Sequence, residues 1–355
     1  MTSVIETKYY PIDPLAPDQG AIEECGRIIR TGGLVAFPTE TVYGLGANAL
    51  DEEACRRIFE AKGRPQDNPL IVHVASPDDI AVLTTELPPQ AAKCIQAFWP
   101  GPLTLVLPKA FRVPAVVSAG LNTLALRMPD HPAALALIRA AGVPVAAPSA
   151  NLSGHPSPTL GRHVMEDLAG RIEAVLDAGP CRVGVESTVL DLTETVPVIL
   201  RPGGITREQL TEILGQVDID PGLQDESQAP RSPGVKYRHY APRGRVVPVS
   251  GPDEKVQARI LQEISRGRNQ GLRVAVLCSA ESAPVYAASG AEYLEILGSN
   301  REPWTVAATL YRAFRECDQR NIDLILAETF TRSGMGAAVM NRLEKAAGHH
   351  VIFET

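Results

Sequence analysis

Short apolar runs alternate along this chain with longer segments whose apolar residues recur at helical spacing. Residues 18–30 form one such helix-like segment, which ends at two glycines, and the apolar run at residues 34–37 follows directly. The alternation continues to the end of the chain, and it predicts an α/β fold in which helices cover sheets. With 355 residues the chain is also longer than one core comfortably serves, so we expect two domains.

The alternation is irregular in the first part of the chain and regular in the last part. Many short strands with uneven connections predict a mixed, twisted sheet for the first part rather than a repeated βαβ unit. The regular pattern of the last part is typical of a doubly wound, Rossmann-like α/β domain with a mainly parallel sheet. Its strands are expected at residues 246–249, 274–277, 293–296 and 324–327, separated by helices of ten or more residues, with a helix at 337–347 and a strand at 351–353 after them.

The segment between these two parts has a different composition. Residues 218–243 are rich in Pro, Asp, Gln and Ser and contain almost no aliphatic residues. A segment of this length without secondary structure is usually a linker or a functional lid. Its second half contains the run K-Y-R-H-Y at residues 236–240, which does not suit a simple spacer. We therefore expect a domain at residues 1–217, a linker or lid at 218–243 and a second domain at 244–355.

Polar clusters lie beside the strands predicted for the first domain, and each has a structural alternative. The segment P-T-E-T at residues 38–41 follows an apolar run, and it either caps the next helix or faces a small-molecule cleft. The segment K-G-R-P-Q-D-N-P at residues 62–69 is either a solvated loop at a helix C-terminus or a site for an anion. In the second case Lys62 and Arg64 point toward a phosphate or a carboxylate, which arginine binds with two parallel hydrogen bonds.

Two further clusters follow later strands. The segment P-S-A-N-L-S-G-H-P-S-P-T at residues 148–159 contains common turn residues, but its hydroxyl, amide and main-chain N–H groups also suit a nucleotide-binding loop. The segment G-V-E-S-T-V at residues 184–189 combines with L-R-P-G-G-I at residues 200–205. The first of these is either a polar strand start or part of a site, and Arg201 before two glycines indicates an anion contact.

His73 and Arg127 each stand inside an otherwise apolar strand, as satisfied core residues or as ligand contacts. The chain has no Walker motif, no G-x-S-x-G motif and no set of protein-kinase motifs. The glycine pairs at residues 44–46 and 334–336 lack the full dinucleotide-binding fingerprint. The clusters thus supply cations, hydroxyls and amides but few acid–base pairs. This inventory favours a site that binds and positions anions over an enzyme with a protein nucleophile.

Composition narrows the possible functions further. The net charge of -7 argues against a broad nucleic-acid-binding surface, although it leaves room for a local basic cleft. Six dispersed cysteines without a C-x-x-C pair indicate reduced thiols, and the seven histidines lack the spacing of a protein-caged metal site. No run approaches the ~18 apolar residues of a membrane span, and the N-terminal segment does not resemble a signal peptide. We therefore expect a cytoplasmic protein without membrane contact.

Six motifs occur in order along the first domain: P-T-E-T-V-Y-G-L-G, K-G-R-P-x-x-N-P-L, W-P-G-P-L-T, R-x-P-x-H-P, P-S-A-N-x-S-G and R-P-G. Together they resemble the YrdC-type threonylcarbamoyl-AMP synthases. The later run S-P-G-V-K-Y-R-H-Y-A-P and the last part of the chain match the longer, two-domain form of that family. The resemblance covers nearly the whole chain from residue 21, and it implies a YrdC-like first domain.

The resemblance implies a nucleotidyltransferase that converts L-threonine, bicarbonate and ATP into threonylcarbamoyl-adenylate and pyrophosphate. That product feeds the formation of threonylcarbamoyladenosine in tRNA. The expected partners are therefore small-molecule substrates and the downstream tRNA threonylcarbamoyl-transfer machinery, with at most a weak contact to tRNA itself. The implied cofactor is Mg²⁺, held mainly through the phosphates of ATP.

The resemblance also assigns roles to individual residues. A lysine-x-arginine pair and a serine-x-asparagine pair hold ATP in the family and are the expected catalytic residues. The corresponding residues in this sequence are Lys62, Arg64, Ser149 and Asn151. Further ATP contacts are expected from Asn68, Thr123, Ser157, Arg201, Tyr237 and His239, the last two on a linker that folds back over the cleft. Threonine contacts are expected from Thr41, His73, Arg127 and Ser187, with Arg127 at the carboxylate.

Two other functions compete with this hypothesis. The first is a non-catalytic module that grips double-stranded RNA or tRNA on a basic face of the first domain. The second is a carbamoyl-transfer domain of the hydrogenase-maturation type, which shares the motifs of the first domain. Proteins of that type carry cysteine-pair zinc motifs, which this sequence lacks.

Overall fold

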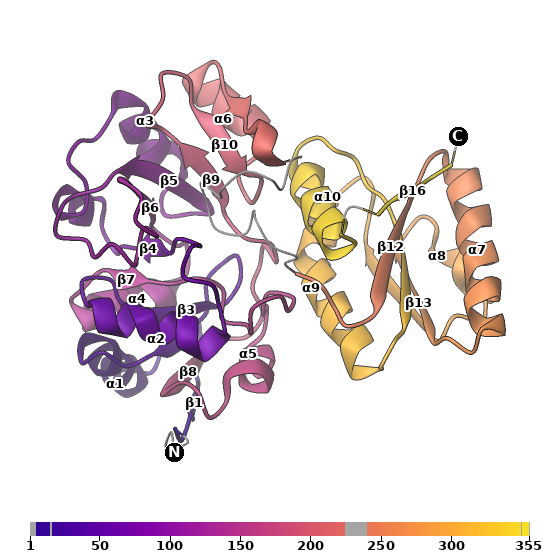
Figure 1. Ribbon diagram of the computed structural model, residues 1–355, viewed down its shortest axis with the longest axis horizontal. Coiled ribbons are helices and arrows are strands. Elements are labelled where there is room, and N and C mark those ends of the chain that lie inside the picture. Colours follow the sequence, from indigo (N-terminus) through magenta and orange to yellow (C-terminus); the bar gives the residue numbers. More distant parts are fainter. Residues whose placement is uncertain (1–4, 15, 224–239, 349, 355) are drawn as a thin grey trace. The chain divides into compact units, whose positions relative to one another are not determined.

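The computed structural model describes residues 5–14, 16–223, 240–348 and 350–354 (Figure 1). Two compact units share the chain, and each has its own sheet. Most of the expected linker or lid lies outside the described residues, and so do Tyr237 and His239. The first unit comprises Met1–Ser153 and Ser157–Tyr237, and the second comprises Gly154–Pro156 and Arg238–Thr355.

The first unit is built on an 11-stranded sheet in the order β1-β8-β2-β3-β7-β4-β6-β5-β9-β10-β11. Parallel and antiparallel neighbours alternate irregularly, so the expectation of a mixed sheet is confirmed. The strands are β1 (Lys8–Pro11), β2 (Val35–Phe37), β3 (Gly44–Asn48), β4 (Ile71–His73), β5 (Leu103–Pro108), β6 (Thr123–Arg127), β7 (Val145–Ala146), β8 (Ala174–Asp177), β9 (Thr188–Asp191), β10 (Val198–Arg201) and β11 (Asp218–Ile219).

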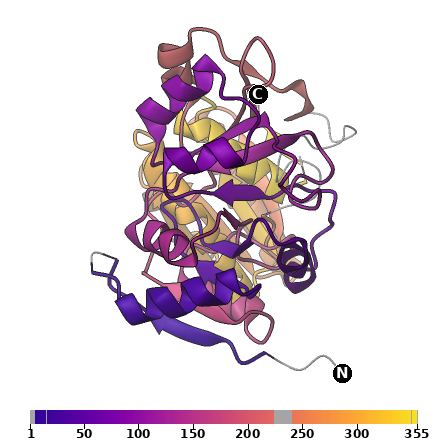
Figure 2. The same cartoon turned by 90° about the vertical axis from the view of Figure 1, so that its left-hand side faces the viewer.

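Helices pack beside these strands (Figure 2), and two local features show how the sequence places them. Helix α2 begins where the Asp51 side chain accepts hydrogen bonds from the N–H groups of Glu53 and Ala54, as a capping residue does. Helices α1 and α4 approach closely at Gly26, where an added Cβ would lie 2.7 Å from the main chain of Ala140. The elements are α1 (Gln19–Arg30), α2 (Glu52–Lys62), α3 (Pro89–Phe98), α4 (Pro132–Ala141), α5 (Gly161–Leu168), α6 (Arg207–Leu214) and the 3₁₀ helices η1 (Pro77–Val82) and η2 (Pro221–Leu223).

The glycine pair at residues 44–46 belongs to a strand that the apolar pattern did not predict. Strand β3 pairs antiparallel with β2, and Phe37 lies opposite Gly44. The Phe37 ring covers both glycines: an added Cβ would lie 3.2 Å from a ring atom at Gly44 and 2.9 Å at Gly46. These glycines therefore make room for an aromatic side chain of the neighbouring strand.

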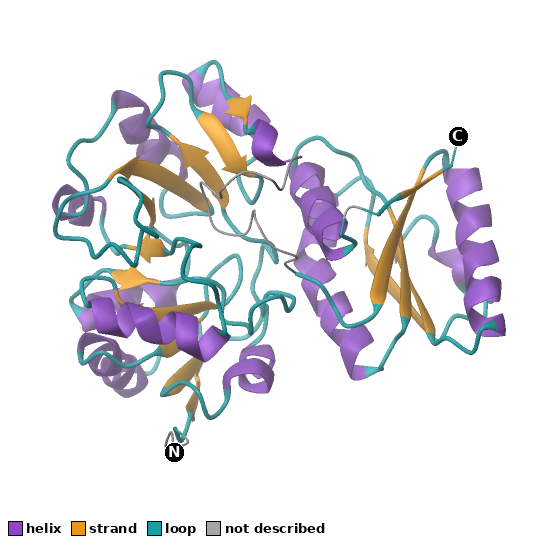
Figure 3. Cartoon of the chain, viewed as in Figure 1, coloured by secondary structure: helices purple, strands orange, loops and turns teal. Residues whose placement is uncertain are grey.

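The second unit holds a five-stranded sheet in the order β14-β13-β15-β12-β16, and its strand pairs are parallel. Helices flank both faces of this sheet, which confirms the doubly wound arrangement (Figure 3). One detail of the expectation was wrong, because the helix between β13 and β14 spans only four residues. Pro284 lies in the first turn of this helix, where proline is tolerated, and Gly290, with a φ of 78°, lies beyond its end. The elements are β12 (Arg245–Ser250), α7 (Asp253–Asn269), β13 (Val274–Ser279), α8 (Ala283–Tyr286), β14 (Tyr293–Gly298), α9 (Pro303–Gln319), β15 (Leu324–Glu328), α10 (Met335–Ala346) and β16 (Ile352–Phe353).

Candidate active site

One group of predicted site residues gathers where β4 and β6 end. These two strands run parallel, and His73 lies opposite Arg127 in register. Strand β5 is antiparallel to β6 and parallel to β9, so the starts of β5 and β9 lie at the same edge. Ser187 directly precedes β9, and Arg201 ends β10 beside it. The four residues His73, Arg127, Ser187 and Arg201 are called the Arg127 cluster below.

Hydrogen bonds connect the members of this cluster to the strands around them. The Arg201 guanidinium donates to the main-chain oxygen of Ser187 at 3.0 Å and to its hydroxyl at 3.1 Å. The Ser187 hydroxyl also lies 2.8 Å from the Thr104 hydroxyl on β5. Arg127 donates through Nε to the main-chain oxygen of Gly101 at 3.3 Å. All of these side chains are buried, so the cluster is held in one geometry before any ligand arrives.

A second group gathers where β4 and β6 start. Strand β7 is antiparallel to β4, so the loop after β7 runs toward the start of β4 and carries Ser149 and Asn151. Arg64 and Asn68 precede β4, and Arg64 donates to the main-chain oxygens of Asn68 at 3.3 Å and Pro69 at 3.2 Å. With Lys62 at the end of α2, these residues are called the Lys62 cluster below. The Lys62 cluster consists of Lys62, Arg64, Asn68, Ser149 and Asn151.

Two further expected ATP contacts, Thr123 and Ser157, belong to neither cluster. Thr123 is the first residue of β6, at the edge where β4 starts and away from Arg127. The Ser157 hydroxyl donates to Glu186 Oε1 at 2.5 Å, which connects it to the residue before Ser187. The strand that separates the two clusters, β4, has three residues and spans only about 7 Å.

The Lys62 side chain connects two of the sequence motifs. It is 2% exposed, and its ammonium group donates to the main-chain oxygens of Ser149 and Asn151. In return, the N–H of Ser153 donates to the main-chain oxygen of Lys62 at 2.9 Å. The end of α2 and the loop after β7 are therefore joined as one piece, and Lys62 determines where the Ser149 and Asn151 side chains lie.

The segment of residues 38–41 extends from the end of β2 to the Arg127 cluster. The main-chain oxygens of Glu40 and Thr41 accept hydrogen bonds from the N–H groups of Val183 and Gly184 at 2.7 and 3.1 Å. The Thr41 hydroxyl lies 2.8 Å from that of Thr39, and both threonines are buried. Glu40 places a carboxylate oxygen 2.7 Å from Arg127 Nη2. The alternative of a helix cap does not hold, because β3 rather than a helix follows this segment.

Electrostatics sets the charge state of His73. Burial is the main cause that lowers its pKa to about 3, and the neighbouring Arg127 cation acts in the same direction. The ring is therefore neutral at physiological pH, and Nδ1 donates to the main-chain oxygen of Ile71 at 3.2 Å. Phe37 contacts the ring edge-on, with 5.9 Å between ring centroids. A neutral imidazole beside Arg127 leaves the positive charge of this cluster to its two arginines, Arg127 and Arg201.

Among the buried side chains in or beside the clusters, Asn68 and Glu40 each have two polar atoms without hydrogen bonds to the described residues. Both side-chain atoms of Asn68 lack a partner there, although the residue is 0% exposed. Both carboxylate oxygens of Glu40 lack one as well, despite the ion pair with Arg127. Buried polar groups are almost always hydrogen-bonded, so such atoms indicate a place for a ligand or ordered water. Asn68 was expected from the sequence, whereas Glu40 had no assigned role.

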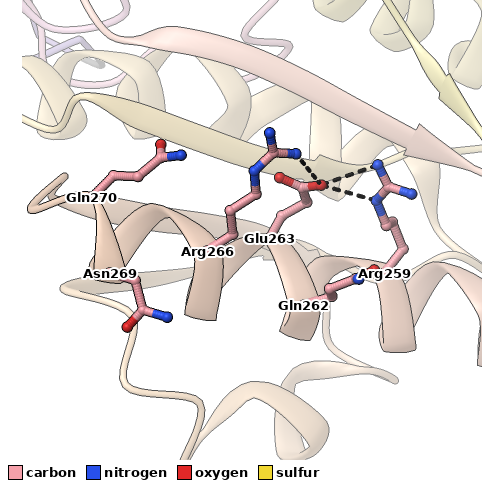
Figure 4. Close-up of a pocket in the computed structure, with 6 residues that line it drawn as sticks. All are labelled: Arg259, Gln262, Glu263, Arg266, Asn269 and Gln270. Atoms are coloured by element: carbon pink, nitrogen blue, oxygen red, sulfur yellow. Dashed lines mark hydrogen bonds and ion pairs between the residues drawn. The ribbon is translucent and has the colours of Figure 1, made fainter.

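The second unit also has a surface pocket, which none of the predicted site residues lines. A pocket of about 460 Å³ lies along α7 in the second unit, lined by Arg259, Gln262, Glu263, Arg266, Asn269 and Gln270 (Figure 4). Glu263 pairs there with Arg259 at 3.0 Å and lies 3.8 Å from Arg266, so its charge is offset within the helix.

Within the described ranges, no group of three or more His, Cys, Asp or Glu side chains is arranged to hold a metal ion. None of the helices described there has both the length and the apolar character needed to cross a membrane.

Two family models match the chain. The model described as "Telomere recombination" matches residues 27–203, and the model described as "Threonylcarbamoyl-AMP synthase, C-terminal domain" matches residues 205–348. Together they span both units, including the two clusters described above.

Curated proteins and a solved structure show the same likeness over nearly the full length. The chain is 50% identical to the threonylcarbamoyl-AMP synthase of Bacillus subtilis over 96% of both chains. It is 51% identical to that of Pyrococcus abyssi, over 91% of this chain and 93% of the relative. The crystal structure of P. abyssi Sua5 complexed with L-threonine superposes with a TM-score of 0.93 at 47% identity, covering 98% of this chain and 100% of the other.

Proposed function

The chain belongs to the threonylcarbamoyl-AMP synthase family, and we propose that it converts L-threonine, bicarbonate and ATP into threonylcarbamoyl-adenylate and pyrophosphate. The observation that carries this proposal is the full-length likeness to a structure solved with L-threonine bound, at a TM-score of 0.93. The positions of the two clusters support it, since they provide neighbouring places for an amino acid and a nucleotide.

In this proposal His73, Arg127 and Ser187 of the Arg127 cluster bind threonine. Arg127 is a buried cation at the end of β6 and matches a carboxylate in charge and shape. Thr41, His73 and Ser187 surround the amino acid from the segment before β3, from β4 and from the start of β9. Because His73 is neutral, it presents no second positive charge to the amine of the substrate.

The Lys62 cluster binds ATP in the same proposal. Arg64 supplies a cation before β4, and Asn68 supplies an amide that has no hydrogen-bond partner among the described residues. Ser149 and Asn151 come from the loop that Lys62 holds. Thr123, Ser157 and Arg201 add contacts from neighbouring strands and loops. Tyr237 and His239, on the expected lid, are proposed to complete the nucleotide site.

The chemistry requires positioning more than a protein nucleophile. The free amine of threonine bonds to the carbon of bicarbonate with loss of water to give a carbamate, whose oxygen then attacks the α-phosphorus of ATP while pyrophosphate leaves. Both reactants are anionic, so fixed cations and oriented donors lower the barrier by offsetting their repulsion and holding them in line. The hydroxyl, amide and cationic side chains of the Lys62 cluster offer Mg²⁺ no carboxylate set, which fits an ion held by the phosphates. When bound there, Mg²⁺ would neutralise charge on the leaving pyrophosphate.

The product is a reactive adenylate that a second enzyme must transfer to tRNA. We propose that the chain delivers it to the tRNA threonylcarbamoyl-transfer machinery. The acidic balance of the chain, with a net charge of -7, fits a role in which tRNA is not itself gripped by a broad basic surface.

The experiment that tests this function measures pyrophosphate release from ATP by the purified chain, with and without bicarbonate. L-threonine, L-serine and no amino acid are compared, and the adenylate is identified by mass spectrometry. The proposal expects release that requires both threonine and bicarbonate. ATP binding without threonine-dependent release would contradict it, and strong, salt-dependent tRNA binding in that protein would favour an RNA-binding module instead.

A further inference from the structure

Glu40 is a buried carboxylate for which neither the resemblance nor the proposed reaction has a role. It lies in the segment between β2 and β3, and its main-chain oxygen is fixed by the N–H of Val183 at 2.7 Å. Its Oε2 atom lies 2.7 Å from Arg127 Nη2, and the two side chains are only 1% and 5% exposed. A charge at this depth is costly unless its surroundings compensate it.

The compensation that the protein itself provides is incomplete. Neither Glu40 oxygen nor Arg127 Nη2 makes a hydrogen bond to the described residues, although Oε2 and Nη2 are close enough. The attraction between them is therefore one of charge, without the angle that a hydrogen bond needs. Arg127 is held from behind by Gly101, whose main-chain oxygen accepts from Nε. A fixed ion pair with unused hydrogen-bonding capacity on both partners is suited to receive a ligand.

The ligand that matches both partners carries a positive and a negative group on neighbouring atoms. A free α-amino acid is such a ligand, because its ammonium and carboxylate groups flank one carbon atom. From these contacts we propose that Glu40 binds the α-ammonium group of L-threonine while Arg127 binds its carboxylate. This inference rests on the proposed function, and it makes Glu40 a determinant of specificity for amino acids over carboxylic acids that lack the amine.

The same arrangement explains why the segment before β3 has a glutamate between two threonines. Glu40 supplies the negative charge that a zwitterionic substrate needs, and its neighbours Thr39 and Thr41 add hydroxyls at the same depth. Without Glu40, Arg127 would hold any small carboxylate. With it, a ligand that has no ammonium group leaves a buried carboxylate without compensation.

Calorimetry on the full chain tests the proposal with two ligands. One is L-threonine, and the other is 2,3-dihydroxybutanoate of matching configuration, which has a hydroxyl in place of the ammonium. The wild-type chain should bind L-threonine at least about tenfold more tightly, the usual value of a hydrogen bond to a charged group. Equal affinities in the wild type would overturn the proposal without any variant.

Glu40→Gln provides the second comparison, because it keeps the shape and removes the charge. We expect L-threonine affinity to fall at least about tenfold, 2,3-dihydroxybutanoate affinity to stay the same or rise, and ATP affinity to stay within about twofold. Equal losses for both carboxylate ligands would mean that Glu40 only shapes the site, and an unchanged threonine affinity would mean that it does not contact the amine. Either result overturns the proposal.

Glu263→Gln is the matched control, since Glu263 is also a buried glutamate paired with an arginine but lies on α7 of the second unit. It should leave threonine affinity unchanged. A wild-type chain that binds ATP but no threonine would refute the proposed function itself. That failure is distinct from a loss of discrimination between the two ligands in a chain that does bind threonine.

Discussion

The ammonium group of Lys62 donates to the main-chain oxygen of Ser149, 87 positions later in the chain, at 2.5 Å. Through this contact the end of α2 supports the loop that follows β7. Lys62 was expected to hold ATP directly, and the structure shows that it contacts the loop carrying two other expected ATP ligands. Its side chain is buried, so its contribution to the site includes holding that loop in place.

Lys62→Met should weaken ATP binding by displacing this loop. Methionine keeps most of the side-chain volume but leaves the main-chain oxygens of Ser149 and Asn151 without this donor, at a cost of about 1–3 kcal/mol for each buried group. Calorimetry with ATP and urea unfolding should both report the change. Lys93→Met, at an exposed position of α3, should change neither. An unaltered unfolding midpoint in Lys62→Met would contradict a supporting role.

Arg64→Ala should lower ATP affinity at least about tenfold, since it removes a cation and its hydrogen bonds from the proposed phosphate site. Arg64 lies just beyond α2 and donates to the main chain of Asn68 and Pro69. Arg56→Ala is the control, because Arg56 pairs with Glu52 on the surface of the same helix. Calorimetry measures the ATP affinity of both variants, and similar affinities for Arg64→Ala and Arg56→Ala would refute the assignment of Arg64.

Thr41→Ala should weaken threonine use more than ATP binding. The Thr41 hydroxyl is fully buried beside that of Thr39, in the segment that also carries Glu40. We expect the KM for threonine to rise at least about fivefold, with the ATP affinity within about twofold, because one hydrogen bond to the substrate is lost. Thr84→Ala, a buried threonine after η1, should leave both unchanged. A threonine dependence identical to that of the wild type would count against this role.

Gly203→Ala should distort the Arg127 cluster. An added Cβ at residue 203 would lie 2.3 Å from the main-chain oxygen of Glu186 and 2.4 Å from main-chain atoms of Ser187 and Thr188. Such overpacking typically costs about 1–3 kcal/mol, and here it would also displace Ser187. Urea unfolding and threonine binding should both be impaired. At Gly222 the nearest atom is a side-chain oxygen of Asp220 at 3.2 Å, so Gly222→Ala should have a much smaller effect.

The stability of the folded chain should decrease as the pH falls below the ordinary pKa of histidine, because of His73. Its pKa is lowered from 6.5 to about 3 in the folded protein, so between these values the unfolded chain binds a proton that the folded chain does not. This group therefore reduces the free energy of unfolding by up to about 1.4 kcal/mol per pH unit across that window. Above the window it has no effect.

Nuclear magnetic resonance can follow His73 in the folded wild type, whose ring signals should not titrate between about pH 5 and pH 8. Urea unfolding of His73→Asn over about pH 4.5 to pH 7.5 should show a shallower pH dependence than the wild type. A ring that titrates near its ordinary pKa would refute the predicted burial of a neutral imidazole.

The local spacing of apolar residues, together with capping residues, was enough to predict most helices and strands of this protein. Helical spacing placed α1 and α2, the cap at Asp51 was visible from its residue type, and short apolar runs marked strands such as β2 and β8. The regular alternation after residue 244 predicted the parallel sheet of the second unit. These features depend on residues close together in the chain, whose spacing and propensity act before any long-range contact forms. The ordered motifs likewise indicated the family, because each is a short run of residues.

The arrangement of the site was decided only in three dimensions. The chain presents Glu40 and Arg127 as isolated charges 87 positions apart, and folding makes them a buried pair. Gly44 and Gly46 had the appearance of an incomplete nucleotide motif until Phe37 of the paired strand was seen to cover them. Sheet order determines which strand ends meet, and that order depends on pairings between distant segments that local spacing does not encode. The sequence therefore supplied the elements and the inventory of chemical groups, while the tertiary structure selected which groups became neighbours and which charges were buried together.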